Sequence, residues 1–148
     1  MKNKFLLPPN LFYASIVLIV VLYFIFRQFN LVKFPYNTVG FVLVAIGVGL
    51  NIIAWQQFVK AGTPEKFEKS KKLVVNGLYK YSRNPMYVGA VLILIGLVLL
   101  LGNVLAFVSP ILFFLAIDKI VIAIEEEKTT NDLGEKYLKY KRKVRKWI

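Results

Sequence analysis

The chain has 148 residues, 57% of them hydrophobic, and a formal net charge of +12 from 20 Lys and Arg against 8 Asp and Glu. This length corresponds to one domain, and the apolar fraction exceeds the roughly 45–50% that is usual for soluble domains. A domain this small buries only part of its surface, so the composition indicates a membrane protein. A basic protein can bind nucleic acid, but long uninterrupted apolar runs argue against that class, and no nucleic-acid partner is expected.

The sequence contains no cysteine and no histidine. Their absence excludes disulfide bonds, a thiol nucleophile, a serine-histidine-aspartate triad and the usual nitrogen and sulfur ligands of zinc or haem, so no metal site is expected. Any chemistry must use carboxylates, Lys and Arg, tyrosines, amides and the backbone, together with a cofactor from outside the chain.

Four apolar stretches follow one another at residues 11–26, 38–58, 86–101 and 104–124. A transmembrane helix needs roughly 20 apolar residues, with a lower limit of about 17, so the first and third stretches are short and need interfacial flanks. We predict an all-α integral membrane protein in which a single domain, residues 1–148, has four transmembrane helices and a C-terminal cytoplasmic amphipathic helix. The expected helices cover residues 11–28, 38–59, 85–101, 104–133 and 135–146.

Glycine, asparagine and proline mark the expected helix ends. The Gly62-Thr63-Pro64 motif ends the second helix, and Asn84-Pro85 is typical of the N-cap and first residue of the third. The Gly102-Asn103 pair predicts a tight turn. The third and fourth helices therefore form an antiparallel hairpin.

A few small or charged residues interrupt the apolar stretches, and structural explanations are favoured for them. Gly47 and Gly49 let helices approach closely, and Ala45 with Gly49 forms a small-xxx-small pair. The adjacent Asp118 and Lys119 are either an ion pair near the cytoplasmic boundary or a functional intramembrane charge. Their adjacency and their place near a helix end favour the ion pair.

The distribution of positive charge predicts the orientation. Eighteen of the 20 Lys and Arg residues lie on the side that four spans assign to both termini and to the middle loop. The opposite side holds only Arg27 and Lys33. Cytoplasmic loops carry an excess of Lys and Arg, so we expect both termini in the cytoplasm.

Two polar segments on this cytoplasmic side contain the residues suited to chemistry. The first, residues 77–89, contains Tyr79, Arg83 and Tyr87, and the second, residues 125–140, opens with three consecutive glutamates. The third helix begins in the first segment and the fourth ends in the second. The hairpin must therefore bring the two segments together.

This meeting place suits a ligand with several kinds of polar group. The N-terminus of a helix attracts carboxylate or phosphate, tyrosine faces attract onium cations, and an arginine can clamp a carboxylate. Glutamates supply a counter-charge or accept from amine and ribose hydroxyl groups. S-adenosylmethionine carries a sulfonium, an amino-acid head and a ribose together, and a site at the membrane surface is open to a lipophilic acceptor.

Each of these residues, taken singly, also has a purely structural explanation. Asn84 and Pro85 are compatible with a simple helix start, Arg83 with the positive flank of a membrane protein, and the tyrosines with an interfacial aromatic belt. The glutamates are compatible with a solvated helix turn. Only the combination points to a site.

The combination forms two motifs. The first consists of Gly77, Tyr79, Arg83-Asn84-Pro85-Met86-Tyr87 and Gly89. The second consists of Glu125-Glu126, Leu133-Gly134-Glu135-Lys136-Tyr137, Tyr140 and Val144-Arg145-Lys146-Trp147. In these motifs the chain resembles the isoprenylcysteine carboxyl methyltransferase and phospholipid methyltransferase superfamily of integral membrane enzymes, over roughly residues 40–147.

The resemblance implies methyl transfer from S-adenosylmethionine to a lipophilic small molecule or lipid-modified acceptor at the cytoplasmic membrane face. Arg83 would orient an acceptor carboxylate or polarise its head group, and Glu125 would fix Arg83 or take a proton from an amine. The implied site consists of catalytic Arg83 and Glu125 and of cofactor-binding Tyr79, Asn84, Pro85, Tyr87 and Glu126.

The sequence departs from the family pattern at a few positions. Asn84 stands where many members have histidine, which excludes an imidazole role there, and Leu133 replaces a frequent phenylalanine. One alternative function is a phospholipid or lipid-amine N-methyltransferase, and another is a non-enzymatic four-helix membrane scaffold or small exporter. A proton-coupled exporter needs an ionisable residue deep in a helix, and the first three spans contain none. Membrane lipids are expected partners, and the sequence carries no signal for an oligomeric state.

Overall fold

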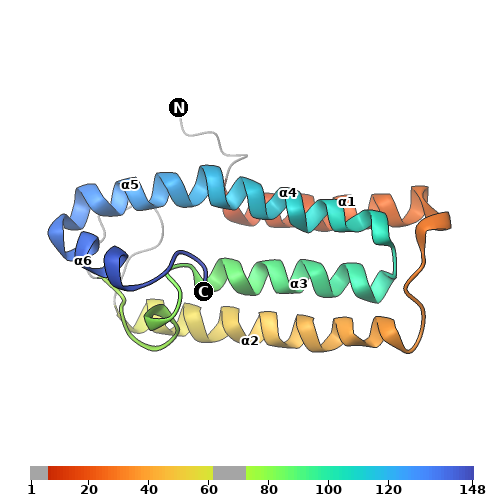
Figure 1. Ribbon diagram of the computed structural model, residues 1–148, viewed down its shortest axis with the longest axis horizontal. Helices are drawn as coiled ribbons and strands as arrows, with labels where there is room; N and C mark the ends of the chain where they lie inside the picture. The colour runs from red at the N-terminus through yellow and green to blue at the C-terminus, as the bar shows by residue number, and fades with distance from the viewer. Residues whose placement is uncertain (1–6, 62–72) are drawn as a thin grey trace.

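The computed structural model describes residues 7–61 and 73–148, and the regular elements in these two ranges are all helical (Figure 1). The Gly62-Thr63-Pro64 motif lies outside the described residues. A 3-10 turn, η4 (Gly77–Lys80), precedes α3, and a π-helical turn, η6 (Ile117–Val121), joins α4 to α5 in one long rod. The α-helices are α1 (Pro8–Ile25), α2 (Val39–Lys60), α3 (Pro85–Leu101), α4 (Val108–Ala116), α5 (Ile122–Leu133) and α6 (Glu135–Lys143).

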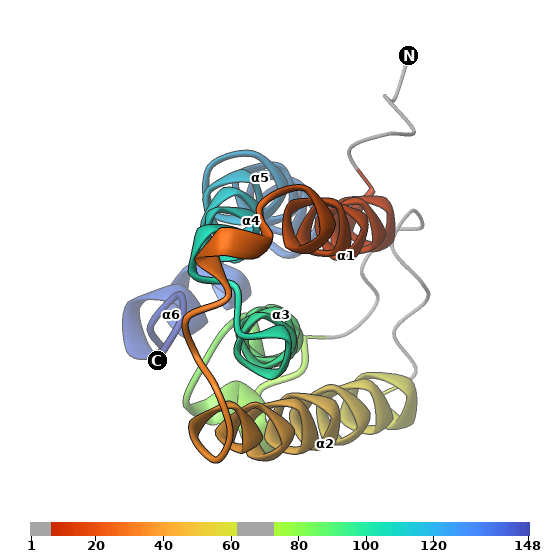
Figure 2. The same ribbon diagram turned by 90° about the vertical axis from the view of Figure 1, so that its right-hand side faces the viewer.

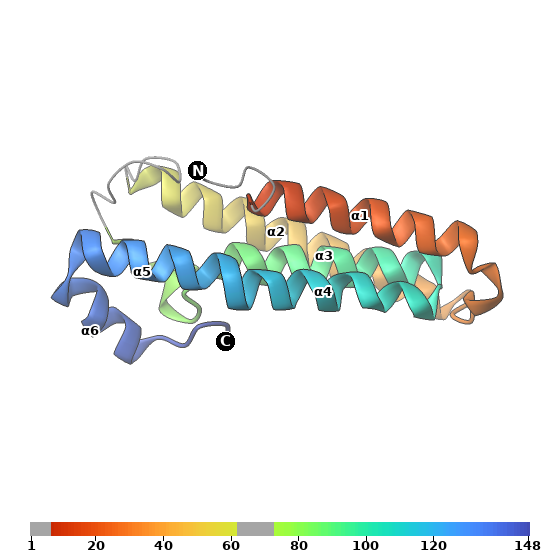
Figure 3. The ribbon, with the colours of Figure 1, turned by 90° about the horizontal axis from the view of Figure 1, so that it is seen from above.

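The helices are arranged around α3. Seen along the bundle, α3 lies between α2 on one side and the neighbouring α1 and α4 on the other (Figure 2). The α4–α5 rod continues past the ends of α2 and α3, and α6 folds back beneath it (Figure 3). The start of α3, the end of α5 and α6 therefore all lie at one end of the bundle.

The length and surface of the helices are those of a membrane protein. Three described helical segments are long and apolar enough to cross a bilayer, Pro8–Ile25, Tyr36–Lys60 and Val104–Leu133, whereas α3 has 17 residues. Large apolar side chains point outward, such as Phe24 and Phe41, which are 57% and 66% exposed. Such a surface is unfavourable in water and matches hydrocarbon. The prediction of an all-α fold is confirmed for the described residues, and the length and outward-facing apolar side chains of the helices support the prediction of an integral membrane protein.

Glycines let α2 and α3 pack backbone to backbone. A Cβ atom on Gly40 would collide with the Gly96 carbonyl oxygen, and one on Gly47 would collide with the Gly89 carbonyl oxygen. Gly49 has no atom of another element within 4 Å of a Cβ position. The predicted close helix contact at Gly47 is therefore confirmed, whereas the small-xxx-small pair Ala45 and Gly49 lies off the face that approaches α3, which carries Gly40 and Gly47, two turns apart.

Replacing Gly47 by alanine is expected to destabilise the protein by about 1–3 kcal/mol, because the added methyl group overpacks the contact with Gly89. The matched change Gly49→Ala adds the same methyl group in open space and is expected to be neutral or slightly stabilising. Thermal unfolding in detergent micelles compares the two variants. Equal melting temperatures would show that the α2–α3 contact is looser than described.

At the opposite end of the bundle, the α3–α4 turn is tied to the α1–α2 connection. Gly102 has a φ of 74°, and its N–H donates to carbonyl oxygens of the last turn of α3. Its own carbonyl accepts from Val32 N–H, in the α1–α2 connection, at 3.1 Å. The fully buried Asn103 donates to the Phe26 carbonyl at 2.9 Å and to Asn30 Oδ1 at 2.7 Å. A buried amide must find such partners, so this network fixes how the hairpin lies against α1.

Two helices, α1 and α6, have an end that lies three residues from its predicted position. α1 covers Pro8–Ile25 instead of residues 11–28, because Pro8 and Pro9 occupy the first helical positions, where proline is favoured, and residues 27–29 form a separate 3-10 turn. α6 ends at Lys143 instead of residue 146, because Val144 is extended and leads a tail that packs against the start of α3.

Candidate active site

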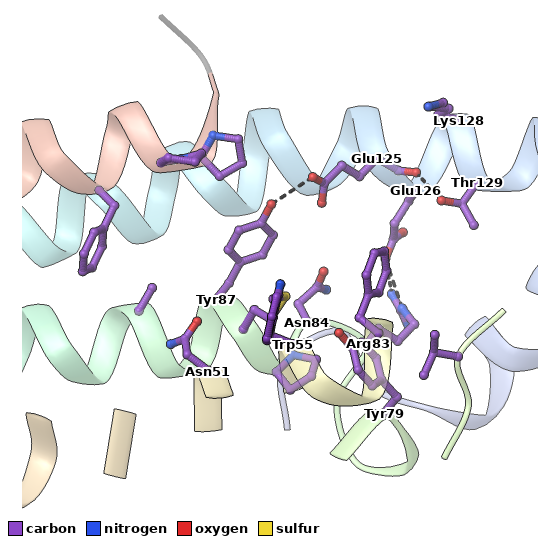
Figure 4. A pocket seen from close by; sticks show the side chains of 18 of the residues that line it. Asn51, Trp55, Tyr79, Arg83, Asn84, Tyr87, Glu125, Glu126, Lys128 and Thr129 are labelled. Carbon is purple, nitrogen blue, oxygen red and sulfur yellow. Dashed lines mark hydrogen bonds and ion pairs between the residues drawn. The ribbon is translucent and has the colours of Figure 1, made fainter. Parts of the chain in front are cut away.

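A cavity of about 730 Å³ opens where the start of α3 meets α5 and α6 (Figure 4). The seven residues predicted for the site all line it. They come from the two sequence segments that the hairpin was expected to bring together. They are Tyr79, Arg83, Asn84, Pro85, Tyr87, Glu125 and Glu126.

The 3-10 turn η4 places Tyr79 against the cavity. Gly77 has a φ of 61° and leaves no room for a side chain, since a Cβ there would collide with the amide of Gln57. Gln57 Oε1 accepts a hydrogen bond from Leu78 N–H at 3.0 Å, which anchors the turn to α2. On the other side, Tyr140 Oη donates to the Tyr79 carbonyl at 2.6 Å.

The phenols of Tyr79 and Tyr140 are both held in their neutral form. Burial raises the pKa of each to about 12, and the charge of Glu125 adds to the effect at Tyr79 whereas Arg83 opposes it at Tyr140. A phenol with such a pKa stays protonated at physiological pH. Both phenols therefore keep the proton of a hydrogen-bond donor, which Tyr140 uses in its bond to the Tyr79 carbonyl.

Arg83 is the most heavily bonded side chain of the site. Its Nε and Nη2 donate to Glu126 Oε1 at 3.0 and 2.7 Å, and the two side chains are only 10% and 12% exposed. Its Nη1 donates to the carbonyl oxygens of Lys141 and Val144 at 3.2 and 2.6 Å. Four of the five guanidinium N–H groups are thus used within the protein.

This arrangement corrects one prediction about the glutamates. Glu125 was one candidate for holding Arg83, but the bonds go to Glu126, whose second oxygen accepts from Lys141 Nζ at 2.6 Å. With both oxygens engaged, Glu126 lines the cavity mainly as the partner of two cations. Arg83 and Glu126 together link the start of α3 to α5 and α6.

Asn84 is the N-cap residue of α3, but its side chain does not cap the helix. Its amide Nδ2 instead donates to the Lys146 carbonyl at 2.9 Å, and its backbone N–H donates to Ser82 Oγ at 3.0 Å. Pro85 occupies the first turn as predicted, where a missing N–H removes no helical bond. The Asn84 amide therefore ties the C-terminal tail to the start of α3.

Glu125 lines the cavity from α5 and faces Tyr87 on α3. Tyr87 Oη donates to Glu125 Oε1 at 2.9 Å, as the dashed line in Figure 4 shows. Thr129 Oγ1 bonds back to the Glu125 backbone carbonyl at 2.7 Å. The glutamate that does not bind Arg83 thus presents its carboxylate beside an aromatic ring.

Further residues that line the cavity were not predicted as part of the site. α2 contributes Asn51 and Trp55, and α1 with α4 contributes Phe12 and Phe113, whose ring centroids are 6.0 Å apart. Asn51 is one of the few polar interruptions in its apolar stretch and was a signal that sequence reasoning left unused. Nothing in the apolar pattern of α1 distinguishes Phe12 from its neighbours.

The lining changes in character along the rod. A helix rises about 1.5 Å per residue, so Phe113 and Glu125 lie roughly 18 Å apart along α4–α5. The end near Glu125 is charged and aromatic, and the end near Phe12 and Phe113 is apolar. A single ligand or a pair of ligands can therefore place polar groups at one end and hydrocarbon at the other.

The fold and the cavity define a helical membrane protein with an open-sided site that is charged at one end and apolar at the other. The phospholipid methyltransferase family matches residues 36–136. The chain therefore belongs to the phospholipid methyltransferase family, and the prediction of a membrane methyltransferase is confirmed at the level of the family.

Two relatives are similar to parts of the chain. Protein-S-isoprenylcysteine O-methyltransferase of Schizosaccharomyces pombe is 39% identical over 134 residues, which cover 80% of this chain and 56% of the relative. An uncharacterized protein of Haemophilus influenzae is 43% identical over 63 residues, which cover 43% of this chain and all of that protein. The chain thus spans little more than half the length of the fission-yeast enzyme. No solved structure matches the chain.

Proposed function

We propose that this protein transfers a methyl group from S-adenosylmethionine to a lipophilic acceptor at the cytoplasmic face of a membrane. The observation that carries the proposal is the single cavity that joins Glu125 and Tyr87 at its polar end to Phe12 and Phe113 at its apolar end. Family membership supports the reaction class. A water-soluble methyl donor and a lipid-like acceptor need these two environments side by side.

The residues present fit S-adenosylmethionine. The cavity volume of about 730 Å³ falls within the roughly 300–1,000 Å³ typical of ligand sites. Tyr79, Tyr87 and Trp55 contribute aromatic faces that attract a sulfonium. Glu125 contributes a carboxylate that suits an amine or a ribose hydroxyl. The sulfonium, the amine and the ribose hydroxyl groups are all present in the cofactor.

When bound, S-adenosylmethionine supplies a methyl group whose carbon is activated by the positively charged sulfur. The chain's own residues then have three tasks. The aromatic rings exclude water from the reacting atoms, the Arg83–Glu126 pair holds the walls of the cavity together, and Glu125 supplies a negative charge beside the positive centre. Catalysis rests on proximity and desolvation, with no covalent intermediate on the protein.

The bonding of Arg83 favours a second candidate for the acceptor. An acceptor carboxylate would need a cation, yet four Arg83 N–H groups already bond to Glu126 and to two carbonyls. An amine acceptor would instead lose its proton to Glu125, within the charged end of the cavity. Methylation of a lipid amine is therefore a second candidate reaction, in addition to methylation of an isoprenylcysteine carboxylate.

Binding of S-adenosylhomocysteine tests the proposal directly. Isothermal titration calorimetry on the purified protein in detergent is expected to give a saturable one-site isotherm, and the ligand should raise the melting temperature. Methylation assays with a farnesylated cysteine and with phosphatidylethanolamine then separate the two acceptors. No response to saturating S-adenosylhomocysteine would contradict the proposal and favour the non-enzymatic scaffold.

The proposed site also requires a particular topology. When α3 is counted as a span together with the three longer helices, the four spans put both termini and the cavity in the cytoplasm and leave Lys33 on the opposite side. Because the chain has no cysteine, single cysteines at Lys136 and Lys33 can be labelled without background. In right-side-out vesicles an impermeant maleimide is expected to label the Lys33 position alone. Labelling of both positions from one face would contradict the four-span arrangement.

A further inference from the structure

The C-terminal tail, residues 144–147, lies between the start of α3 and the π-helical turn η6, and it bonds to both. Towards α3, the Arg145 carbonyl accepts from Arg83 N–H at 3.0 Å, and the Lys146 carbonyl accepts from Asn84 Nδ2 at 2.9 Å. The Val144 carbonyl accepts from the Arg83 guanidinium. Three consecutive tail carbonyls thus hold the two residues that immediately precede α3.

Towards η6, the tail is held by one buried carboxylate. Asp118 Oδ1 accepts from Lys146 Nζ at 2.7 Å and from Trp147 Nε1 at 2.9 Å, and its side chain is 11% exposed. The Trp147 ring lies on Phe114, with ring centroids 4.7 Å apart. Lys119, the partner expected from sequence, reaches Asp118 Oδ2 at 3.0 Å, but its side chain is 75% exposed.

The backbone of the π-helical turn also takes part in this anchor. A π turn replaces i+4 hydrogen bonds by i+5 bonds and occurs frequently at functional positions. Lys146 Nζ also donates to the Asp118 backbone carbonyl at 3.0 Å. One ammonium group therefore binds both the side chain and the backbone of Asp118, and this fixes the tail at a defined height on the rod.

We propose that Asp118 is a positioning residue for the active site and that it acts through the tail. Asp118 does not line the cavity. It holds Lys146 and Trp147, whose backbone neighbours hold Arg83 and Asn84, and these two residues form the cofactor end of the cavity. The inference rests on the proposed function, because its consequence is an altered affinity for the methyl donor.

The charge-neutral variant Asp118→Asn keeps the size of the side chain and removes the ion pair with Lys146. We expect it to weaken S-adenosylhomocysteine binding by about tenfold, measured by calorimetry and normalised to the binding-competent fraction. Lys146→Met is expected to have a similar effect from the other side of the bond. The double variant is expected to bind S-adenosylhomocysteine no more weakly than either single variant, because both substitutions break the same ion pair.

Lys119→Ala is the matched control, because it removes a donor from the same carboxylate without touching the tail. It is expected to bind S-adenosylhomocysteine like the unmodified protein, as exposed ion pairs contribute little. If Asp118→Asn lowers the melting temperature but leaves the affinity unchanged, Asp118 only stabilises the fold and the inference is overturned. Additive losses in the double variant would overturn it as well.

A second measurement does not depend on the cofactor. In a Trp55→Phe background Trp147 is the one remaining tryptophan of the chain, and its emission reports on the tail. Asp118→Asn is expected to shift this emission to longer wavelength, as the indole leaves Phe114 for water, whereas Lys119→Ala is not. An unmoved emission would overturn the inference. Absence of binding by the unmodified protein would instead overturn the proposed function.

Discussion

Replacing Arg83 by alanine is expected to reduce kcat/KM for methyl transfer by roughly a hundredfold or more. The change leaves Glu126 buried without its arginine and leaves the carbonyls of Lys141 and Val144 without their donor. Breaking one side of a buried ion pair typically costs about 3–5 kcal/mol. The part of that cost that raises the transition state relative to the free enzyme and substrate lowers kcat/KM tenfold for every ~1.4 kcal/mol.

Initial rates with a radiolabelled methyl donor, corrected for the folded fraction, measure this effect. Arg83→Lys keeps the charge but cannot reach Glu126 and the tail carbonyls together, so an intermediate activity is expected. Arg142 is a suitable control, because its 3.9 Å ion pair with Glu135 is exposed and its removal should change little. Unchanged kcat/KM in Arg83→Ala would remove this arginine from the mechanism.

Replacing Glu125 by glutamine is expected to lower kcat by roughly 10²–10⁴-fold, the range over which a general base contributes. Glutamine can still accept the hydrogen bond from Tyr87, so the geometry of the cavity is kept while the charge is lost. The loss therefore reports on the negative charge at this position. A lipid-amine acceptor should suffer more than a carboxylate acceptor, because only the amine has a proton to give up.

Glu127→Gln provides the control for this change, since Glu127 is exposed and does not line the cavity. It removes the same charge from the same helix and is expected to leave kcat within twofold of the unmodified protein. Rates at saturating concentrations of both substrates distinguish the loss of kcat from weaker binding. Equal losses in the two variants would assign the effect to net charge and not to the site.

The residues of the site were predictable because they lie within two short sequence motifs. Tyr79, Arg83 and Tyr87 precede or open one apolar stretch, and Glu125 and Glu126 close the next. A hairpin between those stretches brings the motifs to one end of the bundle whatever the details of packing. The apolar stretches likewise fix an all-helical membrane protein, because a chain in lipid must satisfy its backbone hydrogen bonds within helices.

The partner of Arg83 could not be predicted in the same way. Consecutive residues on a helix point about 100° apart, so the rotation of α5 decides whether Glu125 or Glu126 faces the arginine. That rotation depends on the π turn at Ile117–Val121, which shifts the register of every later residue on the rod. No periodicity in the sequence marks this turn.

The sequence alone determined the class of protein, the helix hairpin and the set of polar residues that meet at its end, since composition and spacing act locally along the chain. Only the tertiary structure decided which glutamate each cation binds, which glycine faces α3, and that α1 and α4 supply the apolar end of the cavity. These outcomes depend on helix rotation and on contacts between segments far apart in the chain, and they arise only when the helices pack.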